Sequence, residues 1–322
     1  MKKKFALISA LCALFVMTFA SRQVIDCCRY GLSLCLDLIL PSLLPFFLIS
    51  TLLGRLGLPS LLGQYLAPAA ARLFRVSGQG ATALFVGLTG GYPMGAAYIA
   101  ELIRDGILPE SEGERLLGFC NNSGPSFLVG AIGAGVFGSA RIGLRLYGVH
   151  ILAALLTGLL LRGRGPGGMG TVPDRLPAES ATDLSRLLPD AVQQTVSSLL
   201  NVCGFVVCFS VFTGLLEASG LIGSLTRLLG ADSPAHAQML RALLTGFWEL
   251  GSGIGALRGL APTPLNLAAA AALAGWGGIS VHFQTLAVLS DTGIKGALHT
   301  AGRLIHAILS FLLIYGISLL KS

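Results

Sequence analysis

The chain has 322 residues, of which 53% are hydrophobic and only 11% charged, whereas charged residues make up about 25% of a typical soluble domain. A soluble globule of this size must cover its surface with polar side chains, so the composition excludes a soluble enzyme. The net charge of +7 is spread over short loops, which is typical of membrane loops and argues against nucleic-acid binding. The sequence therefore predicts an all-α polytopic membrane protein whose surroundings are the lipid bilayer.

The N-terminus has the pattern of a membrane-targeting segment. Lysines at positions 2–4 precede an apolar run over residues 5–20. This pattern is typical of a cleaved secretory signal peptide and also of an uncleaved first helix. Because a chain that continues into many spans does not need cleavage, we expect residues 1–23 to form a signal-anchor helix.

The next two segments are a long apolar run and a shorter amphipathic one. Residues 24–57 predict a long helix that is kinked or broken at Pro41 and Pro45. Residues 59–75 place arginines in or beside an apolar stretch. This second pattern predicts a helix that lies in the membrane interface.

Residues 80–104 consist of two apolar halves, each too short to cross a bilayer. The halves, 81–89 and 96–103, flank a centre at 90–95 that is rich in glycine and contains a proline. A spanning helix needs about 20 apolar residues. We therefore expect a re-entrant hairpin that enters and leaves the membrane on the same side.

Residues 112–137 form an apolar run with a polar, proline-containing interruption at 121–125. Lipid cannot hydrogen-bond the backbone groups that such an interruption frees, so the break must face protein or a watery cavity. We expect an interrupted transmembrane helix here, followed by an ordinary span over residues 141–161.

A polar linker at residues 163–187 divides the chain near its middle, and the order of element types then repeats. The expected elements of the second half are a long span at 188–217, a short interfacial helix at 221–229, a re-entrant hairpin at 238–260 broken at 248–253, an interrupted helix at 265–289 broken at 275–280, and a closing span at 296–319. Each half contributes an odd number of crossings. We therefore predict that residues 24–162 and 188–322 form an inverted repeat with two re-entrant hairpins and two interrupted transmembrane helices.

Inverted repeats with paired broken helices are typical of secondary transporters, whose substrate site lies near the membrane midplane. We expect the breaks to converge on one site, where free amides at half-helix N-termini suit a carboxylate. Polar side chains at the breaks could hydrogen-bond the solute, and two aromatic side chains could stack on a planar ring. The candidate substrate-binding residues are Gly91, Tyr92, Pro93, Gly95, Asn121, Asn122, Ser123, Trp248, Glu249, Gly251, Ser252, Gly278, Ser280 and His282.

Several of these residues have a structural interpretation beside the functional one. Glu249, a carboxylate in an apolar segment, is either a proton carrier or cation partner, or pairs with an arginine to hold the hairpin tip. His282 could titrate during transport, whereas a packing role is favoured for His150 and His306. The Asn121–Asn122 pair could serve only to cap broken helix ends.

Motifs of soluble enzymes and metal sites are missing from the sequence. It contains no G-x-x-x-x-G-K-[ST], no H-E-x-x-H and no G-x-S-x-G. Its 7 cysteines include no C-x-x-C and suggest neither a disulfide framework nor a zinc site. We therefore predict no enzymatic activity, no metal and no cofactor. A coupling ion, sodium or proton, and a homo-oligomeric state are left open.

Several segments of the first half carry a family resemblance: Pro41-Ser42-Leu43-Leu44-Pro45-Phe46-Phe47, Gly90-Gly91-Tyr92-Pro93-Met94-Gly95, Glu114-Arg115-Leu116-Leu117 and Phe119-Cys120-Asn121-Asn122-Ser123-Gly124-Pro125. They resemble the YlbJ (SpoVV) family of sporulation integral membrane proteins, which carries the nucleoside-recognition Gate domain and is similar in layout to concentrative nucleoside transporters. The similarity runs from Val24 to the C-terminus and is strongest in the first half. Gly90 and Gly124 depart from the family pattern, which has serine and commonly asparagine there.

The resemblance implies a Gate-like first repeat and a carrier of dipicolinic acid in the outer forespore membrane during sporulation. A planar pyridine with two carboxylates suits a site made of half-helix N-termini, amides and aromatic rings. Two alternatives stay open at this point. One is a cation- or proton-coupled nucleoside transporter, and the other is a non-transporting membrane component of a sporulation complex, in which the breaks would be dispensable.

Overall fold

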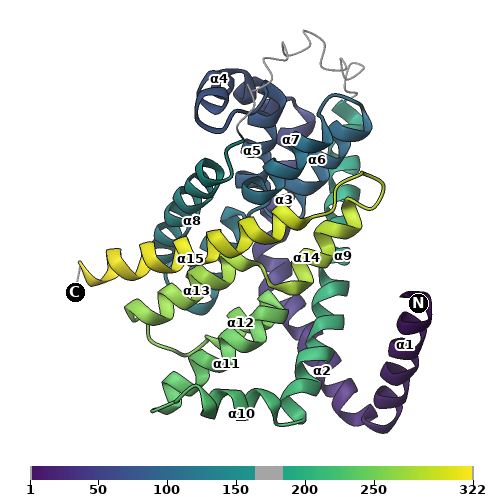
Figure 1. Cartoon of the computed structure of the whole chain (residues 1–322), viewed down its shortest axis with the longest axis vertical. Coiled ribbons are helices and arrows are strands. Elements are labelled where there is room, and N and C mark those ends of the chain that lie inside the picture. Colours follow the sequence, from purple (N-terminus) through teal and green to yellow (C-terminus); the bar gives the residue numbers. More distant parts are fainter. Residues whose placement is uncertain (1, 164–183, 321–322) are drawn as a thin grey trace.

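A computed structural model describes residues 2–163 and 184–320, and every regular element in these two ranges is a helix (Figure 1). Within them, 5 helical segments are long and apolar enough to cross a membrane. They are Ser21–Arg55, Ala140–Leu160, Ser185–Ala218, Pro264–Val288 and Ala297–Leu319. The predicted class, an all-α polytopic membrane protein, is confirmed.

The element order repeats in the two halves of the chain. After α1 (Lys2–Phe19), the first half contains α2 (Ser21–Leu34), η1 (Cys35–Ile39), α3 (Leu40–Arg55), α4 (Leu58–Phe74), α5 (Gly78–Gly90), α6 (Met94–Arg104), α7 (Glu110–Cys120), η2 (Ser126–Val136) and α8 (Ala140–Leu160). The second half contains α9 (Leu184–Ala218), α10 (Leu221–Leu228), α11 (Pro234–Trp248), α12 (Leu250–Ala256), α13 (Pro264–Trp276), α14 (Gly278–Val288) and α15 (Ala297–Leu319). In both halves a long helix is followed by a short helix, a hairpin, an interrupted helix and a closing span.

The two hairpins lie at opposite ends of the molecule. In Figure 1 the first hairpin, α5–α6, lies with α4 and α7 near the top, and the second hairpin, α11–α12, lies with α10 near the bottom. An inverted repeat places its halves in this way. The repeat boundaries at 24–162 and 188–322 stay predictions, and the linker predicted at 163–187 lies largely outside the described residues.

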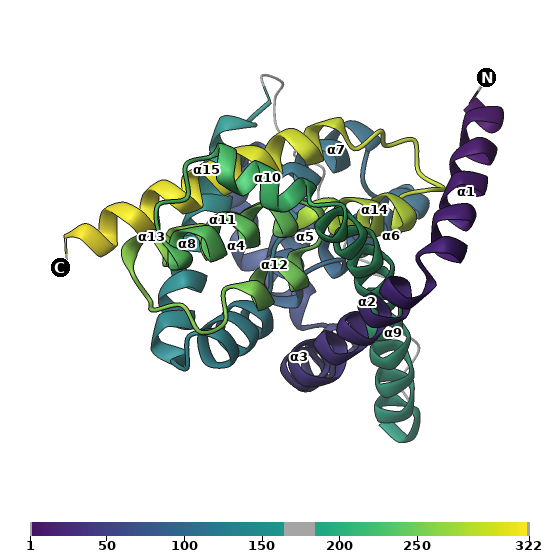
Figure 2. The same ribbon diagram turned by 90° about the horizontal axis from the view of Figure 1, so that it is seen from below.

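The N-terminal helix α1 projects away from the rest of the molecule (Figure 2). It meets the helix bundle at its junction with α2. Its role as a signal anchor stays a prediction.

The first long helix is widened near the prolines but not broken. Its irregular segment is the π-helical η1, which ends directly before Leu40 and Pro41. Proline has no N–H to donate and its ring crowds the carbonyl of the preceding turn, so the strain falls upstream of Pro41. Pro45 lies inside α3, which continues as a regular α-helix to Arg55.

The breaks of the second half are narrower than predicted. The expected interruptions at 248–253 and 275–280 are reduced to Glu249, between α11 and α12, and to Gly277, between α13 and α14. The Glu249 side chain caps α12, so the next helix begins at once. Gly277 and Gly278 have φ +85° and +77°, left-handed conformations that glycine adopts at no steric cost and that interrupt the helix.

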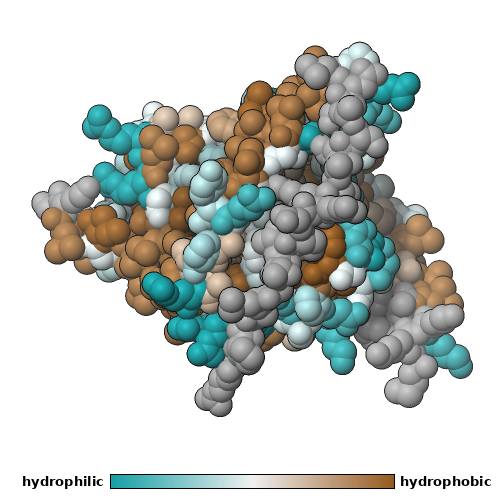
Figure 3. All heavy atoms as spheres, turned by 90° about the horizontal axis from the view of Figure 1, so that it is seen from above, coloured by the Kyte–Doolittle hydropathy of each residue, from teal (hydrophilic) through white to brown (hydrophobic). Residues whose placement is uncertain are grey.

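The outward faces of the long helices are apolar. Large side chains such as Leu36 on α2–η1, Leu200 on α9 and Leu312 on α15 are more than half exposed, as expected of groups that contact lipid. Seen from the end that carries α4, hydrophobic and hydrophilic side chains are mixed (Figure 3). Such a mixture suits an end that faces the membrane–water boundary.

Glycines inside the helices allow close approach to the backbone of α7. A Cβ on Gly87 of α5 would collide with the Cys120 carbonyl, and a Cβ on Gly302 of α15 would collide with the Gly118 carbonyl of α7. Lipid provides no hydrophobic driving force between helices, so close packing at small residues stabilises their contacts.

We expect Gly302→Ala to destabilise the protein, because the added methyl group forces α15 away from α7. Overpacking of this kind costs about 1–3 kcal/mol. Gly316→Ala on the same helix is the matched control, since a Cβ there meets nothing within 4 Å. Thermal unfolding of the detergent-purified protein should show a lower midpoint for Gly302→Ala alone. Equal midpoints for the two variants would contradict this packing.

Candidate functional site

Each hairpin tip packs against the interruption of its own half. In the first half, a Cβ on Gly91 would lie 2.9 Å from the backbone nitrogen of Gly124. In the second half, a Cβ on Gly278 would lie 2.9 Å from the Leu250 nitrogen and 3.3 Å from the Trp248 carbonyl oxygen. The backbone groups freed by one break are thus covered by the other break of the same half.

The two pairs of breaks also contact each other. The hydroxyls of Tyr92 and Ser123 both donate to the Ala274 carbonyl, over 3.1 and 3.2 Å. The Asn121 amide donates to the Thr285 hydroxyl over 2.8 Å. Residues more than 150 positions apart therefore meet at one place, and the expected convergence of the breaks is seen directly in the structure.

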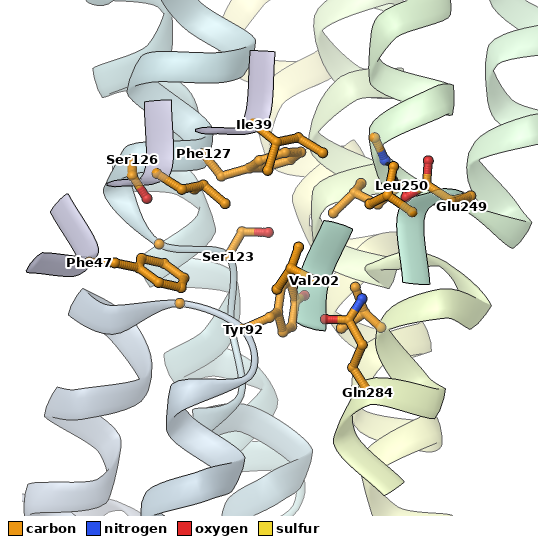
Figure 4. Close-up of a pocket in the computed structure, with 16 residues that line it drawn as sticks. Ile39, Phe47, Tyr92, Ser123, Ser126, Phe127, Val202, Glu249, Leu250 and Gln284 are labelled. Carbon is orange, nitrogen blue, oxygen red and sulfur yellow. Dashed lines mark hydrogen bonds between the residues drawn. The ribbon is translucent and has the colours of Figure 1, made fainter. Parts of the chain in front are cut away.

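A cavity lies at this convergence, between the halves (Figure 4). On the first-half side, Figure 4 shows Phe47 and Ser126, and on the second-half side Glu249 and Gln284. Its remaining walls are largely apolar, with Val202 among them. An apolar cavity with a few polar groups is the usual form of a small-molecule site.

The predicted site residues fall into two groups. Those that line the cavity are Gly91, Tyr92, Ser123, Glu249 and Gly251. Those that lie behind its wall or elsewhere at the breaks are Pro93, Gly95, Asn121, Asn122, Trp248, Ser252, Gly278, Ser280 and His282. Phe47, Ser126 and Gln284 also line the cavity but were not among the predicted site residues. Phe47 and Ser126 lie close to the predicted breaks at Pro45 and Pro125, whereas Gln284 has no break signal beside it.

Several of the second group have structural partners. Gly95 lets α6 approach the Cys120 carbonyl, and the Ser252 hydroxyl lies 3.1 Å from the Ser210 hydroxyl of α9. Trp248 packs edge-on against Phe212, with ring centroids 4.9 Å apart. Pro93 follows a cis peptide bond at the hairpin tip. These residues hold the breaks in place.

Glu249 acts as a helix cap in this structure. One carboxylate oxygen accepts the Gly251 N–H over 2.9 Å, and the other accepts the Ser252 N–H. No arginine pairs with Glu249 among the ion pairs of the described residues. The arginine contact weighed from the sequence is therefore replaced by a contact with the backbone of α12, where amide dipoles offset the negative charge.

Arg303, which the sequence analysis did not single out, is the most buried charge at the site. It lies on α15 and has no exposed surface. Its guanidinium donates to the Tyr92 hydroxyl over 3.1 Å and to the Asn122 side-chain oxygen over 3.1 Å. It also reaches the Gly118 carbonyl at 3.4 Å. One cation therefore joins the first hairpin tip, the first interruption and the closing span of the other half.

Two histidines extend this network. Arg303 donates to His306 Nδ1 over 2.9 Å, and the His306 ring lies 4.2 Å from that of His150. His150 Nε2 accepts the Ser123 N–H over 3.1 Å. Both histidines are thus part of the site network, beyond the packing role that the sequence favoured. His282 is not hydrogen-bonded to these groups, and its ring lies 4.4 Å from that of Trp276 and 5.0 Å from that of His299.

An ion pair links the halves away from the cavity. Arg104, at the end of α6, lies 2.8 Å from Asp291 in the loop between α14 and α15. Its hydrogen bond lowers the pKa of the Asp291 carboxyl below its usual value. Because both groups are well exposed, the pair contributes little to stability.

We expect Tyr92→Phe to destabilise the protein by about 1–3 kcal/mol, because it removes an acceptor from a buried guanidinium. The thermal unfolding midpoint of the purified protein is the measurement. Tyr65→Phe is the matched control, since that phenol ring is 80% exposed. A Tyr92→Phe variant as stable as the control would show that the network does not stabilise the hairpin tip.

Comparison with known proteins gives one informative relative. The chain is 32% identical over 293 residues to the sporulation integral membrane protein YlbJ of Bacillus subtilis (strain 168), a match that covers 83% of this chain and 71% of that protein. No protein-family model matches the chain. No solved structure matches it either. The expected likeness to the Gate domain and to nucleoside transporters stays a prediction.

Proposed function

The chain belongs to the family of the sporulation integral membrane protein YlbJ, and on this premise we propose that it carries a small planar anion across a membrane. Dipicolinic acid is the first candidate substrate, and the outer forespore membrane is the proposed location. The protein itself is a multi-pass membrane protein, and its relative is named for sporulation.

The observation that supports transport most directly is the meeting of the breaks around one cavity. Helix interruptions inside an apolar bundle are costly unless their backbone groups find partners. Here both breaks of the first half donate to the Ala274 carbonyl of the second half, and breaks of both halves border the same cavity. A non-transporting membrane scaffold has no need of such breaks, whereas carriers place their substrate between them.

The chemistry of the cavity suits a planar ring with carboxylates. Phe47, Phe127 and Tyr92 supply aromatic faces, and Ser123, Ser126 and Gln284 supply hydrogen-bonding groups. Dipicolinic acid combines a flat pyridine ring with two carboxylates. A nucleoside would also find stacking surfaces here, so it belongs among the competitors in any test.

Flux through purified protein in lipid vesicles tests the proposal. We expect saturable uptake of radiolabelled dipicolinate that excess unlabelled dipicolinate abolishes and that nucleosides leave unchanged. Asn122→Ala should reduce this flux, because Asn122 helps to hold Arg303 and the first interruption together. Absence of flux in the wild type, or competition by nucleosides alone, contradicts the proposed substrate.

A variant that narrows the cavity provides a second test. Val202 of α9 lines the cavity, and Val196 on the same helix is 41% exposed. Overpacking a filled site costs about 1–3 kcal/mol, so we expect Val202→Phe to weaken dipicolinate uptake roughly tenfold to a hundredfold. Val196→Phe should transport like the wild type. Similar flux in both variants would show that the solute does not pass through this cavity.

A further inference from the structure

Arg303 is a buried cation without a counter-charge in the described part of the chain. Its acceptors, Tyr92 Oη, Asn122 Oδ1, the Gly118 carbonyl and His306 Nδ1, are all neutral. The ion pairs between described residues do not include it. Its Nε, also buried, has no hydrogen-bond acceptor among these residues. A buried charge is costly to keep unless something compensates it.

The buried carboxylates Glu112 and Glu249 form no ion pair with Arg303 among the described residues, and each accepts backbone N–H groups instead. Glu112 accepts the Ser77 N–H over 2.6 Å, and Glu249 accepts the N–H groups of Gly251 and Ser252. Both acids are bound to backbone amides in other elements. The positive charge of Arg303 is therefore not neutralised by a carboxylate of the described residues, and its electric field acts on the groups around it.

The nearest open surroundings are the cavity between the halves. Tyr92 lines the cavity with one face of the hairpin tip, and its hydroxyl accepts from Arg303 over 3.1 Å. Asn122, the other side-chain oxygen that Arg303 contacts, is followed directly by Ser123, whose side chain Figure 4 shows at the cavity. A single layer of side chains thus separates the guanidinium from the cavity.

The cavity wall itself adds no other cation. Its polar members are Tyr92, Ser123, Ser126, Glu249 and Gln284, and the rest are apolar side chains or glycines. The charge on Glu249 is offset by the amides of α12. Arg303 lies behind this wall and is a cation without a carboxylate partner among the described residues.

We propose that Arg303 is the fixed charge by which this cavity selects anionic ring compounds, acting through Tyr92 and Asn122 without touching the solute itself. This inference rests on the proposed function as a carrier and adds the residue that sets its charge preference. A charge one side chain away changes the affinity for an anion by roughly tenfold to a hundredfold at the effective dielectric of a protein interior.

The charge preference is measured with ligands of one shape and different charge. Pyridine-2,6-dicarboxylate, pyridine-2-carboxylate and the uncharged pyridine-2,6-dicarboxamide are bound to the purified full chain, and their dissociation constants are compared. We expect the wild type to prefer the dicarboxylate over the dicarboxamide by at least about tenfold. Equal affinities for the dicarboxylate and the dicarboxamide, or binding of neither of these two compounds, overturn the inference.

Asn122→Asp is the decisive variant, because it neutralises Arg303 while leaving Arg303 in place. The new carboxylate lies where the amide oxygen is now 3.1 Å from the guanidinium. It loses the donation of the Asn122 amide to the Phe119 carbonyl and gains an ion pair. We expect its preference for the dicarboxylate to fall to about threefold or less. A preference equal to that of the wild type overturns the inference.

Asn121→Asp is the matched control for this charge change. Asn121 is equally buried, but its amide binds Thr285 and its oxygen has no partner among the described residues. A carboxylate there lacks the direct contact with Arg303 that Asp at position 122 makes. We expect the thermal unfolding midpoint to fall further for Asn121→Asp than for Asn122→Asp. If the midpoint falls as far or further for Asn122→Asp, the guanidinium of Arg303 is not available to pair with a carboxylate at position 122.

Two substitutions of Arg303 separate charge from shape. Arg303→Lys keeps the charge and should keep most of the preference for the dicarboxylate, whereas Arg303→Gln should abolish it. The thermal midpoint of each variant is measured beside its affinity, to detect poor folding. If both Arg303 variants fold poorly, Asn122→Asp still tests the inference.

Failure of this inference can be distinguished from failure of the proposed function. Dipicolinate flux that Asn122→Asp leaves unchanged would overturn the role of Arg303 and leave transport standing. A preference for the dicarboxylate in the binding assay that is lost in Asn122→Asp, without any dipicolinate flux, would do the reverse.

Discussion

Backbone groups that lose their helical partners inside an apolar bundle must find new ones, and this constraint shapes the whole molecule. Four helix interruptions occur in the described residues, and none of them stands alone. Gly91 packs on Gly124, Gly278 packs on the start of α12, and the two pairs meet at the Ala274 carbonyl. The cavity exists because the breaks cannot be separated without leaving polar groups in lipid.

The positions of the breaks could be predicted because they violate the pattern of their surroundings. Glycine, proline and paired amides at 90–95 and 121–125 cannot continue an apolar helix. The second-half breaks were predicted too wide, since one capping carboxylate at Glu249 and two left-handed glycines at Gly277 and Gly278 suffice to interrupt a helix. The position of a helix interruption is therefore easier to predict from the sequence than the number of residues it takes.

The hydrogen-bond partners of Arg303 could not be predicted from the sequence. An arginine inside the apolar run 296–319, with His299 and His306 at helical spacing on one face, was a visible signal of an intramembrane polar site. Its meaning depends on Tyr92 and Asn122, which lie 211 and 181 positions away. No local pattern pairs residues at such a separation, so the charge could be noticed but not assigned.

The charge also connects the repeat architecture to the proposed transport. Arg303 belongs to the second half, yet all its acceptors except His306 come from the first half. Any movement that parts α15 from the first hairpin tip must remove hydrogen bonds from a buried guanidinium, which costs several kcal/mol. An anion near Tyr92 lowers that cost, because it supplies the charge that the departing dipoles no longer offset. A neutral solute supplies nothing of the kind, so in the proposed carrier the group that selects the solute would also be the group whose partners change when the halves move.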